Sequence, residues 1–126
     1  MKALILTIAA TALALSVCSV ALRAAVLPPA EEKRIEALIA AIERMTEAIF
    51  IRNGRPYAAA AAAEFLRRKW RQREAEVGSA EDFIGKVASF SSTTGQPYLI
   101  RFSDGRETPC ALFLRTELSS LRKKAP

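Results

Sequence analysis

The chain has 126 residues, with 19 lysines and arginines against 13 aspartates and glutamates, and its formal net charge is +6. It contains no histidine and only two cysteines, which excludes Ser-His-Asp and Cys-His catalysis, histidine-ligated metal sites and a thiolate zinc site. Neither a Walker motif nor a dinucleotide-binding glycine motif is present, so we expect no cofactor and no bound metal.

The N-terminal segment is typical of a secretory signal peptide. A positive start at Lys2 is followed by an apolar run over residues 3–22 and by small residues around Ala24. We therefore expect a periplasmic or secreted protein. Its chain would have three parts: a signal peptide over 1–24, a linker over 25–30 and a single domain over 31–126.

Two alternatives for this segment stay open. About twenty apolar residues can also span a membrane, and an uncleaved segment would tether a structural protein. The residues before Cys18 also loosely resemble a lipoprotein attachment motif, although Val17 is large for that position.

Cleavage changes both the charge and the cysteine count. Removal of residues 1–24 takes Lys2 and Arg23 away, so 17 basic and 13 acidic residues remain and the net charge falls to +4. So mild a balance indicates an ordinary solvated surface, and we expect no nucleic-acid partner. Cys110 is then alone; we expect it to be buried, with pairing to another chain as the alternative.

Two long helices are predicted first. The first starts near residue 31, and its apolar face recurs at three- and four-residue steps: Ile35, Leu38, Ile39, Ile42, Met45 and Ile49. Residues 50–57 break the pattern, and Asn53-Gly54 predicts a turn there. The alanine-rich segment from about Ala58 to Val77 predicts the second helix.

The remainder predicts a short helix, a hairpin and a closing helix. Ser79 with Asp82 has the form of a capping box that opens the third helix, and the polar residues 89–96 must be a loop. Residues 97–102 and 106–108 predict two strands around a turn, and the last helix begins near Pro109. The expected fold is α+β: a small, mostly helical domain of about four helices, with one β-hairpin between the third and last helices.

Several segments, in order, resemble the YfeK-like family of short exported bacterial proteins, a domain of unknown function. They are Phe50–Gly54, Tyr57, Ala63–Lys69, Ser79–Ile84, Val87–Ser89 and Ser91–Tyr98. The resemblance covers essentially the whole chain after the signal peptide and implies export, but it implies no activity. Phe65 is a departure, because relatives often have histidine there; a histidine-based reaction is therefore closed to this chain.

The resemblance directs attention to polar residues that a core does not need. We expect two loops to meet and form a shallow polar binding site from Arg52, Asn53, Tyr57, Lys69, Ser91, Ser92 and Tyr98. Arg52 and Lys69 would favour an anionic group or a partner's carboxylate. The alternative is purely structural: Asn53 makes the turn, the serines cap backbone groups and Lys69 is solvated.

The leading hypothesis is a non-catalytic periplasmic binding or interaction module. Its partner would be a protein, a peptide, a glycan or an anionic small molecule; a membrane contact is expected only if the N-terminal segment is retained. The main rival is a small hydrolase that uses serine with lysine or carboxylates. A serine within hydrogen-bond reach of Lys69 or Lys86 in a deep pocket would favour that rival.

We predict that the native protein lacks its first 21 to 25 residues, because a positive start, an apolar run and small residues precede Val26. Intact-mass spectrometry of protein from its native host checks this. A mass that retains the segment 1–22 would contradict cleavage and favour the anchor.

Overall fold

A computed structural model describes residues 27–125, so the predicted signal peptide and the first two residues of the predicted linker lie outside the described residues. The elements run α1 (Pro29–Glu43), β1 (Ile49–Arg52), β2 (Arg55–Ala58), α2 (Ala59–Gln72), a 3₁₀ turn (Glu74–Glu76), α3 (Ala80–Lys86), β3 (Leu99–Arg101), β4 (Glu107–Pro109) and α4 (Cys110–Lys124). The α+β class is confirmed, with four α-helices and a small sheet in the described part of the chain. None of the helices between residues 27 and 125 is long and apolar enough to cross a membrane.

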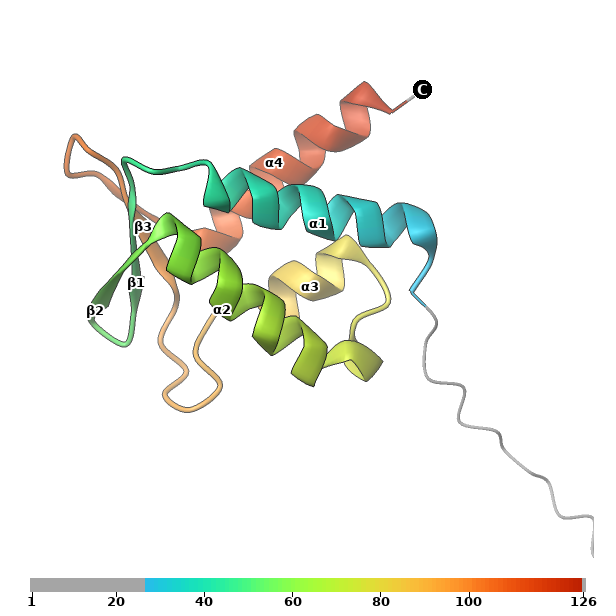
Figure 1. Cartoon of the computed structure of the whole chain (residues 1–126), viewed down its shortest axis with the longest axis horizontal. Coiled ribbons are helices and arrows are strands. Elements are labelled where there is room, and N and C mark those ends of the chain that lie inside the picture. Colours follow the sequence, from blue (N-terminus) through green and yellow to red (C-terminus); the bar gives the residue numbers. More distant parts are fainter. Residues whose placement is uncertain (1–26, 126) are drawn as a thin grey trace, which may run out of the picture.

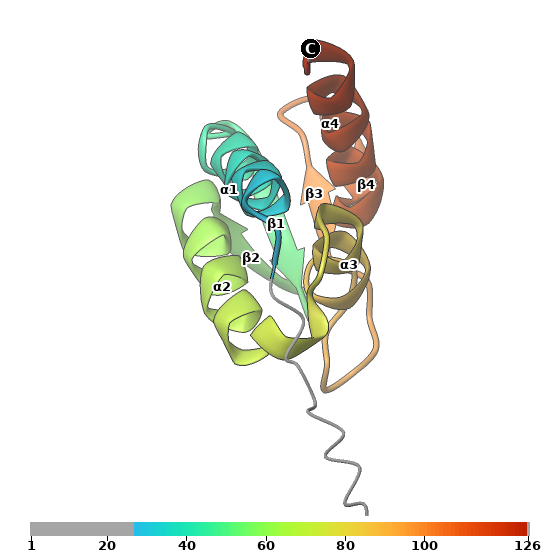
Figure 2. The ribbon, with the colours of Figure 1, turned by 90° about the vertical axis from the view of Figure 1, so that its right-hand side faces the viewer.

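The strands form an antiparallel sheet at one end of the molecule, and the helices extend from it (Figure 1). The strand order is β2-β1-β3-β4, so two hairpins meet along β1 and β3. Phe50 on β1 and Ile100 on β3 are register partners and are both buried. Figure 2 shows α1 beside α2, and α3 beside α4, as their mutual contacts also require.

The core lies where the apolar faces of the helices meet the sheet. Pro29 opens α1, where a missing N–H costs nothing, and Glu31 and Glu32 favour the positive end of the helix dipole. The predicted face of α1 is buried at four fully enclosed positions: Ile35, Leu38, Ile39 and Ile42. Small buried residues on α2, such as Ala59 and Ala63, allow α2 to lie close to its neighbours.

The first helix is shorter than predicted, and a hairpin follows it. Helix α1 ends at Glu43, whereas Ile49 begins β1 and is 41 % exposed, so it does not continue the buried face. The expectation of only one hairpin was therefore wrong. Asn53 and Gly54 do form the predicted turn, with φ of 51° and 74°, which is the two-residue geometry that joins twisted antiparallel strands.

Proline ends or interrupts each outer strand of the sheet. Pro56 lies in β2 and Pro109 in β4, and these are the two edges of the sheet order. A proline has no N–H for a ladder hydrogen bond, so an edge strand is where it is tolerated. The second predicted hairpin, β3 with β4, is present and leads directly into α4.

The third helix begins as the sequence predicts. The Ser79 hydroxyl accepts a hydrogen bond from the Asp82 backbone N–H at 3.1 Å. Asp82 reaches back, although to the Gly78 N–H at 3.0 Å rather than to that of Ser79. Two backbone donors at the start of α3 are thereby satisfied.

Replacing the cap, Ser79→Ala, should lower the free energy of unfolding by about 1 kcal/mol, because the Asp82 N–H loses its acceptor. Urea denaturation measures this. Ser120→Ala, at an exposed position inside α4, is the matched control and should change stability by only a few tenths of a kcal/mol. Equal midpoints for the Ser79 variant and the unmodified protein would show that Ser79 is not a stabilising cap.

Candidate functional site

A groove of about 590 Å³ lies between α2, the end of β1 and the loop 89–96. Its wall combines basic, hydroxyl, amide and aromatic side chains: Arg52, Asn53, Phe65, Arg68, Lys69, Gln72, Arg73, Ser91, Ser92, Thr93 and Tyr98. Six of the seven residues predicted for a polar site line this groove. The seventh, Tyr57, lines an adjoining cavity and contacts Arg52.

The two loops meet directly. The Thr94 hydroxyl donates a 2.6 Å hydrogen bond to the Asn53 side-chain oxygen, across 41 positions of sequence. The structure thus brings the β1–β2 turn against the 89–96 loop, which is the geometry on which the predicted site depends. Whether this surface binds a ligand stays a prediction.

Lys69 is buried, contrary to the solvated position of the structural alternative. Only 7 % of Lys69 is exposed, and its ammonium donates 2.9 Å hydrogen bonds to the Phe90 carbonyl and to the Tyr98 hydroxyl. Burial, with the nearby charges of Arg73 and Arg52, lowers the pKa of Lys69 to about 8. Lys69 is therefore mostly charged at neutral pH and loses that charge in mildly alkaline solution.

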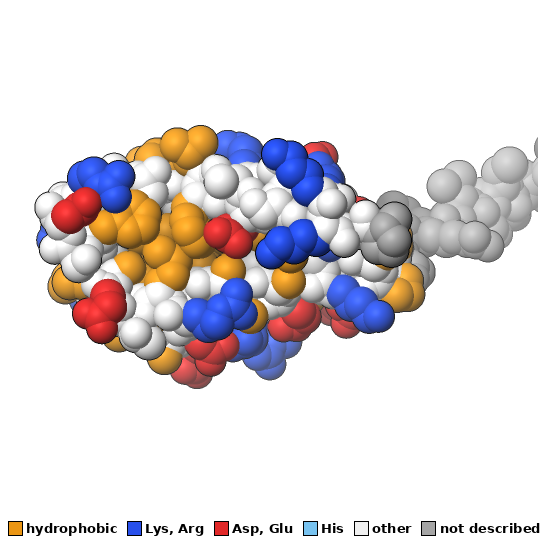
Figure 3. Space-filling view, turned by 90° about the horizontal axis from the view of Figure 1, so that it is seen from above, with side chains coloured by type: hydrophobic (Ala, Val, Ile, Leu, Met, Phe, Trp, Pro, Cys, Tyr) orange, Lys and Arg blue, Asp and Glu red, His pale blue; other side chains and the backbone are white. Residues whose placement is uncertain are grey.

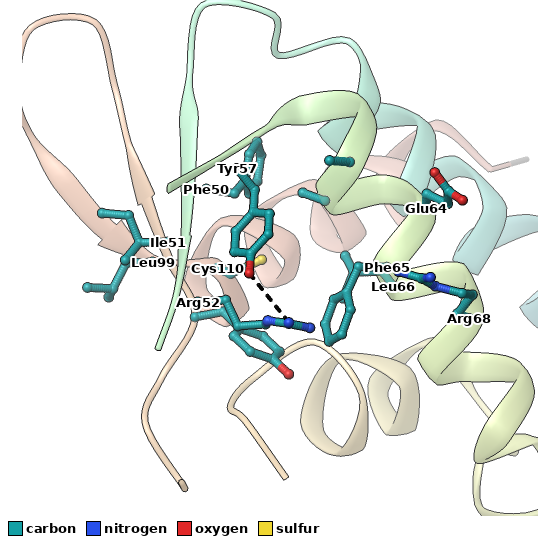
Figure 4. A pocket seen from close by; sticks show the side chains of 13 residues that line it. Phe50, Ile51, Arg52, Tyr57, Glu64, Phe65, Leu66, Arg68, Leu99 and Cys110 are labelled. Atoms are coloured by element: carbon teal, nitrogen blue, oxygen red, sulfur yellow. Dashed lines mark hydrogen bonds between the residues drawn. The ribbon is translucent and has the colours of Figure 1, made fainter. Parts of the chain in front are cut away.

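Arg52 lies among aromatic rings. Its guanidinium carbon is 4.1 Å from the centre of the Phe65 ring and 5.2 Å from that of Tyr57, both within cation–π range. It also donates a long 3.4 Å hydrogen bond to the Tyr57 hydroxyl, the dashed line in Figure 4. The Phe65 ring thus provides an aromatic contact for the Arg52 cation.

Tyr98 closes the floor between these two cations. Its ring meets Phe65 edge-on, with centres 5.8 Å apart, and its hydroxyl accepts a hydrogen bond from the Lys69 ammonium. Burial raises the pKa of Tyr98, although the charge of Arg52 opposes the shift. Tyr98 therefore stays neutral over the physiological range and can accept from Lys69.

Ser91 stabilises the loop 89–96 and is not placed as a nucleophile. It is 5 % exposed, its hydroxyl accepts from the Thr93 and Thr94 backbone N–H groups at 3.3 and 3.4 Å, and it shares a 3.0 Å bond with the Thr93 hydroxyl. This part of the structural alternative holds for Ser91, as it does for the turn at Asn53. Ser92 is exposed on the same loop.

The lysines considered for a serine–lysine pair are engaged elsewhere. Lys69 donates to Phe90 and Tyr98, while Lys86 donates to the Glu76 carbonyl at 2.9 Å and lies 3.9 Å from Asp82. Within residues 27–125 no hydrogen bond joins either lysine to a serine. That span also holds no group of three or more carboxylate or thiol side chains placed to bind a metal ion.

The electrostatics of the groove are one-sided. Arg52, Arg68, Lys69 and Arg73 line it, and no carboxylate of the described residues does. Arg73 is partly compensated, because it lies 3.7 Å from Glu76 and donates to the Lys86 carbonyl. Elsewhere the charges are mixed: the face in Figure 3 carries both signs around an apolar area at the strand end.

The sequence analysis did not include Arg68, Gln72 and Arg73 in the predicted site, although they line the groove. Their spacing holds a usable signal, because 68 and 72, and 69 and 73, are each four apart and lie on neighbouring rows of one helix. Arg68 and Arg73, on neighbouring rows with the buried Lys69, indicate a shared basic face. Thr94 was missed because no sequence rule pairs it with Asn53.

A second, smaller cavity adjoins the groove, with a volume of about 210 Å³. It lies between the inner face of the β1–β2 hairpin and the first turns of α2, as Figure 4 shows. Its apolar wall includes Phe50, Ala62, Leu66 and Cys110. Cys110 is buried, as expected. Burial raises the pKa of its thiol to about 12, so the thiol is poorly reactive.

Comparison with known proteins gives a family but no activity. Residues 29–122 match a family described only as a family of unknown function, DUF5329. The chain is similar to the uncharacterized protein YfeK of Salmonella typhimurium (strain LT2), at 41 % identity over 68 residues. That match covers 54 % of this chain and 57 % of YfeK, so it spans little more than half of either protein. No solved structure matches the chain significantly.

The depressed pKa of Lys69 predicts a pH-dependent stability. Between the folded pKa of about 8 and the ordinary value of 10.5, the unfolded chain binds the proton that folded Lys69 has released, so the free energy of unfolding rises with pH. From pH 7 to pH 9.5 we expect the free energy of unfolding to rise by on the order of 1 kcal/mol more than that of Lys69→Met. Urea denaturation of both proteins at both pH values measures this.

The comparison of slopes isolates Lys69 from the other groups that titrate in this range. Lys69→Met loses two hydrogen bonds and will be less stable at both pH values. The diagnostic quantity is the difference in free energy of unfolding between the two proteins, and how that difference changes with pH. Parallel pH profiles for the two proteins would mean that Lys69 titrates as an exposed lysine does.

Proposed function

The chain belongs to the family of unknown function DUF5329, and we propose that this member is a small exported binding module whose groove holds an anionic group without catalysing a reaction. The observation that carries the proposal is the groove itself, with four cationic side chains and no carboxylate among its described lining residues. Such an arrangement is unfavourable when empty, because like charges repel, and it is relieved by an anion.

The donors are suited to an oxyanion. An ammonium has three protons, and Lys69 uses two of them on Phe90 and Tyr98, which leaves one for a ligand. Arg52 and Arg68 carry planar forks that match carboxylate and phosphate oxygens, and neither forms an ion pair within the described residues. The exposed hydroxyls of Ser92 and Thr93 at the rim add neutral donors.

Two further points support a binding role outside the cytoplasm. The positive start and apolar run before residue 24 favour export, and the small size of the domain favours a module over a multi-step enzyme. The anion can be a free small molecule or a group on a protein, peptide or glycan. All of these would present the oxyanion that the cations of the groove would bind.

The test is titration with sulfate, a dianion across the neutral range, followed by backbone amide shifts in NMR spectra at constant ionic strength. Shifts should concentrate on the loop 89–96 and the end of β1. Arg68→Gln should weaken sulfate binding about two- to fivefold, because an exposed charge contact is worth up to about 1 kcal/mol.

Arg71→Gln is the matched control. Arg71 is exposed on the same helix, three positions on, and does not line the groove, so the general loss of one positive charge is identical in both variants. Equal weakening by the two substitutions would reduce the effect to overall charge. An absence of saturable shifts in the unmodified protein would overturn the anion site.

A further inference from the structure

The cavity and the groove are neighbours. Arg52, Phe65, Arg68 and Tyr98 line both, so one molecule that contacts these side chains can lie against both hollows. Figure 4 shows the guanidinium of Arg52 between Tyr57 and Phe65, while Ile51 and Leu99 point to the other face of the sheet. Arg52 therefore lies at the junction of a charged and an apolar compartment.

The cavity has the size and lining of a site for a compact apolar group. An enclosed apolar cavity of about 150 Å³ is enough to take up benzene. This one has about 210 Å³, is partly open to solvent, and has Glu64 in its lining besides the arginines. Aromatic and aliphatic side chains supply most of its wall, and Cys110 adds a neutral thiol. An empty space with such walls forfeits contacts that a ring or a branched alkyl group would restore.

We propose that the ligand of this protein is an amphipathic carboxylate, with its carboxylate held by Arg52 and Arg68 at the groove and a phenyl-sized apolar group inserted in the cavity between the β1–β2 hairpin and α2. This inference rests on the proposed anion-binding function and names the ligand class for the same site. It commits to an organic acid over an inorganic anion, because sulfate or phosphate leaves the cavity unfilled.

The local chemistry of Arg52 favours this ligand. Of its five N–H donors, the described residues engage one in a hydrogen bond, the long contact to Tyr57. The other donors are available to a planar carboxylate, and Phe65 and Tyr57 also line the cavity. The charged and apolar contacts of one small molecule can therefore be made together.

The test compares three probes by NMR titration of the full chain at pH 7. They are 3-phenylpropionate, which has both parts, acetate, which has only the carboxylate, and 3-phenylpropionamide, which has only the ring. We expect 3-phenylpropionate to bind at least about tenfold more tightly than either fragment, since burying a ring contributes more than the 1.4 kcal/mol that tenfold requires.

Filling the cavity separates its contribution from that of the cations. Ala61 lines the cavity from the first turn of α2 and is exposed, so Ala61→Leu places a larger side chain there without disturbing the core. It should weaken 3-phenylpropionate about tenfold and leave acetate and sulfate unchanged. Ala60→Leu, the adjacent exposed position outside the cavity wall, is the matched control and should change none of them.

The outcomes distinguish this inference from the function on which it rests. Equal affinity for acetate and 3-phenylpropionate would overturn the inference and leave the anion site standing. Equal affinity for the amide and the acid would overturn the anion site, and no saturable binding of sulfate or of any probe would overturn both. A carboxylate on a chain end is tested with N-acetyl-glycyl-phenylalanine: tighter binding than 3-phenylpropionate assigns the site to peptide C-termini, and weaker binding assigns it to free acids.

Discussion

Burial of the Lys69 ammonium without a carboxylate is the constraint on which the rest of the site depends. The ammonium donates to one carbonyl and one phenol, from Phe90 and Tyr98, so α2, the start of the loop and the residue before β3 are joined at a single atom. Neutral oxygens compensate a buried cation less well than a carboxylate does, and the lowered pKa of Lys69 records that deficit. The fold thus tolerates, at one position, an electrostatic cost that an anion would reduce.

The sheet determines where that position lies. The β1–β2 hairpin places Arg52 and Tyr57 on its inner face, opposite the first turns of α2, while β3 brings Tyr98 in beside β1. Residues that are up to 46 positions apart therefore share one wall. The loop 89–96 is held over them by its own serine and threonine hydroxyls and by the Asn53 contact.

Helices with a strong apolar period or a cap were predictable, and so was the β3–β4 hairpin, because each depends on residues close in sequence. The β1–β2 hairpin was not, although Asn53-Gly54 is a strong turn signal. Its strands are four residues long, Ile49 happens to continue the period of the preceding helix, and Ala58 merges with the alanine run of α2. Local period cannot separate a short strand from the end of a helix. For the site, unexplained polar residues identified Arg52 and Lys69, whereas the cavity depends on which side chains meet across the sheet and could not be inferred from period.

The prolines of the outer strands limit how this protein can associate with other chains. An open four-stranded sheet exposes two edges, and unpaired edges recruit further strands, which is a common beginning of aggregation. Here Pro56 and Pro109 each remove a donor from those edges, which disfavours pairing with a strand of a neighbouring molecule. The sheet is therefore a poor template for growth by strand addition, and contacts through side chains are favoured over edge-to-edge pairing.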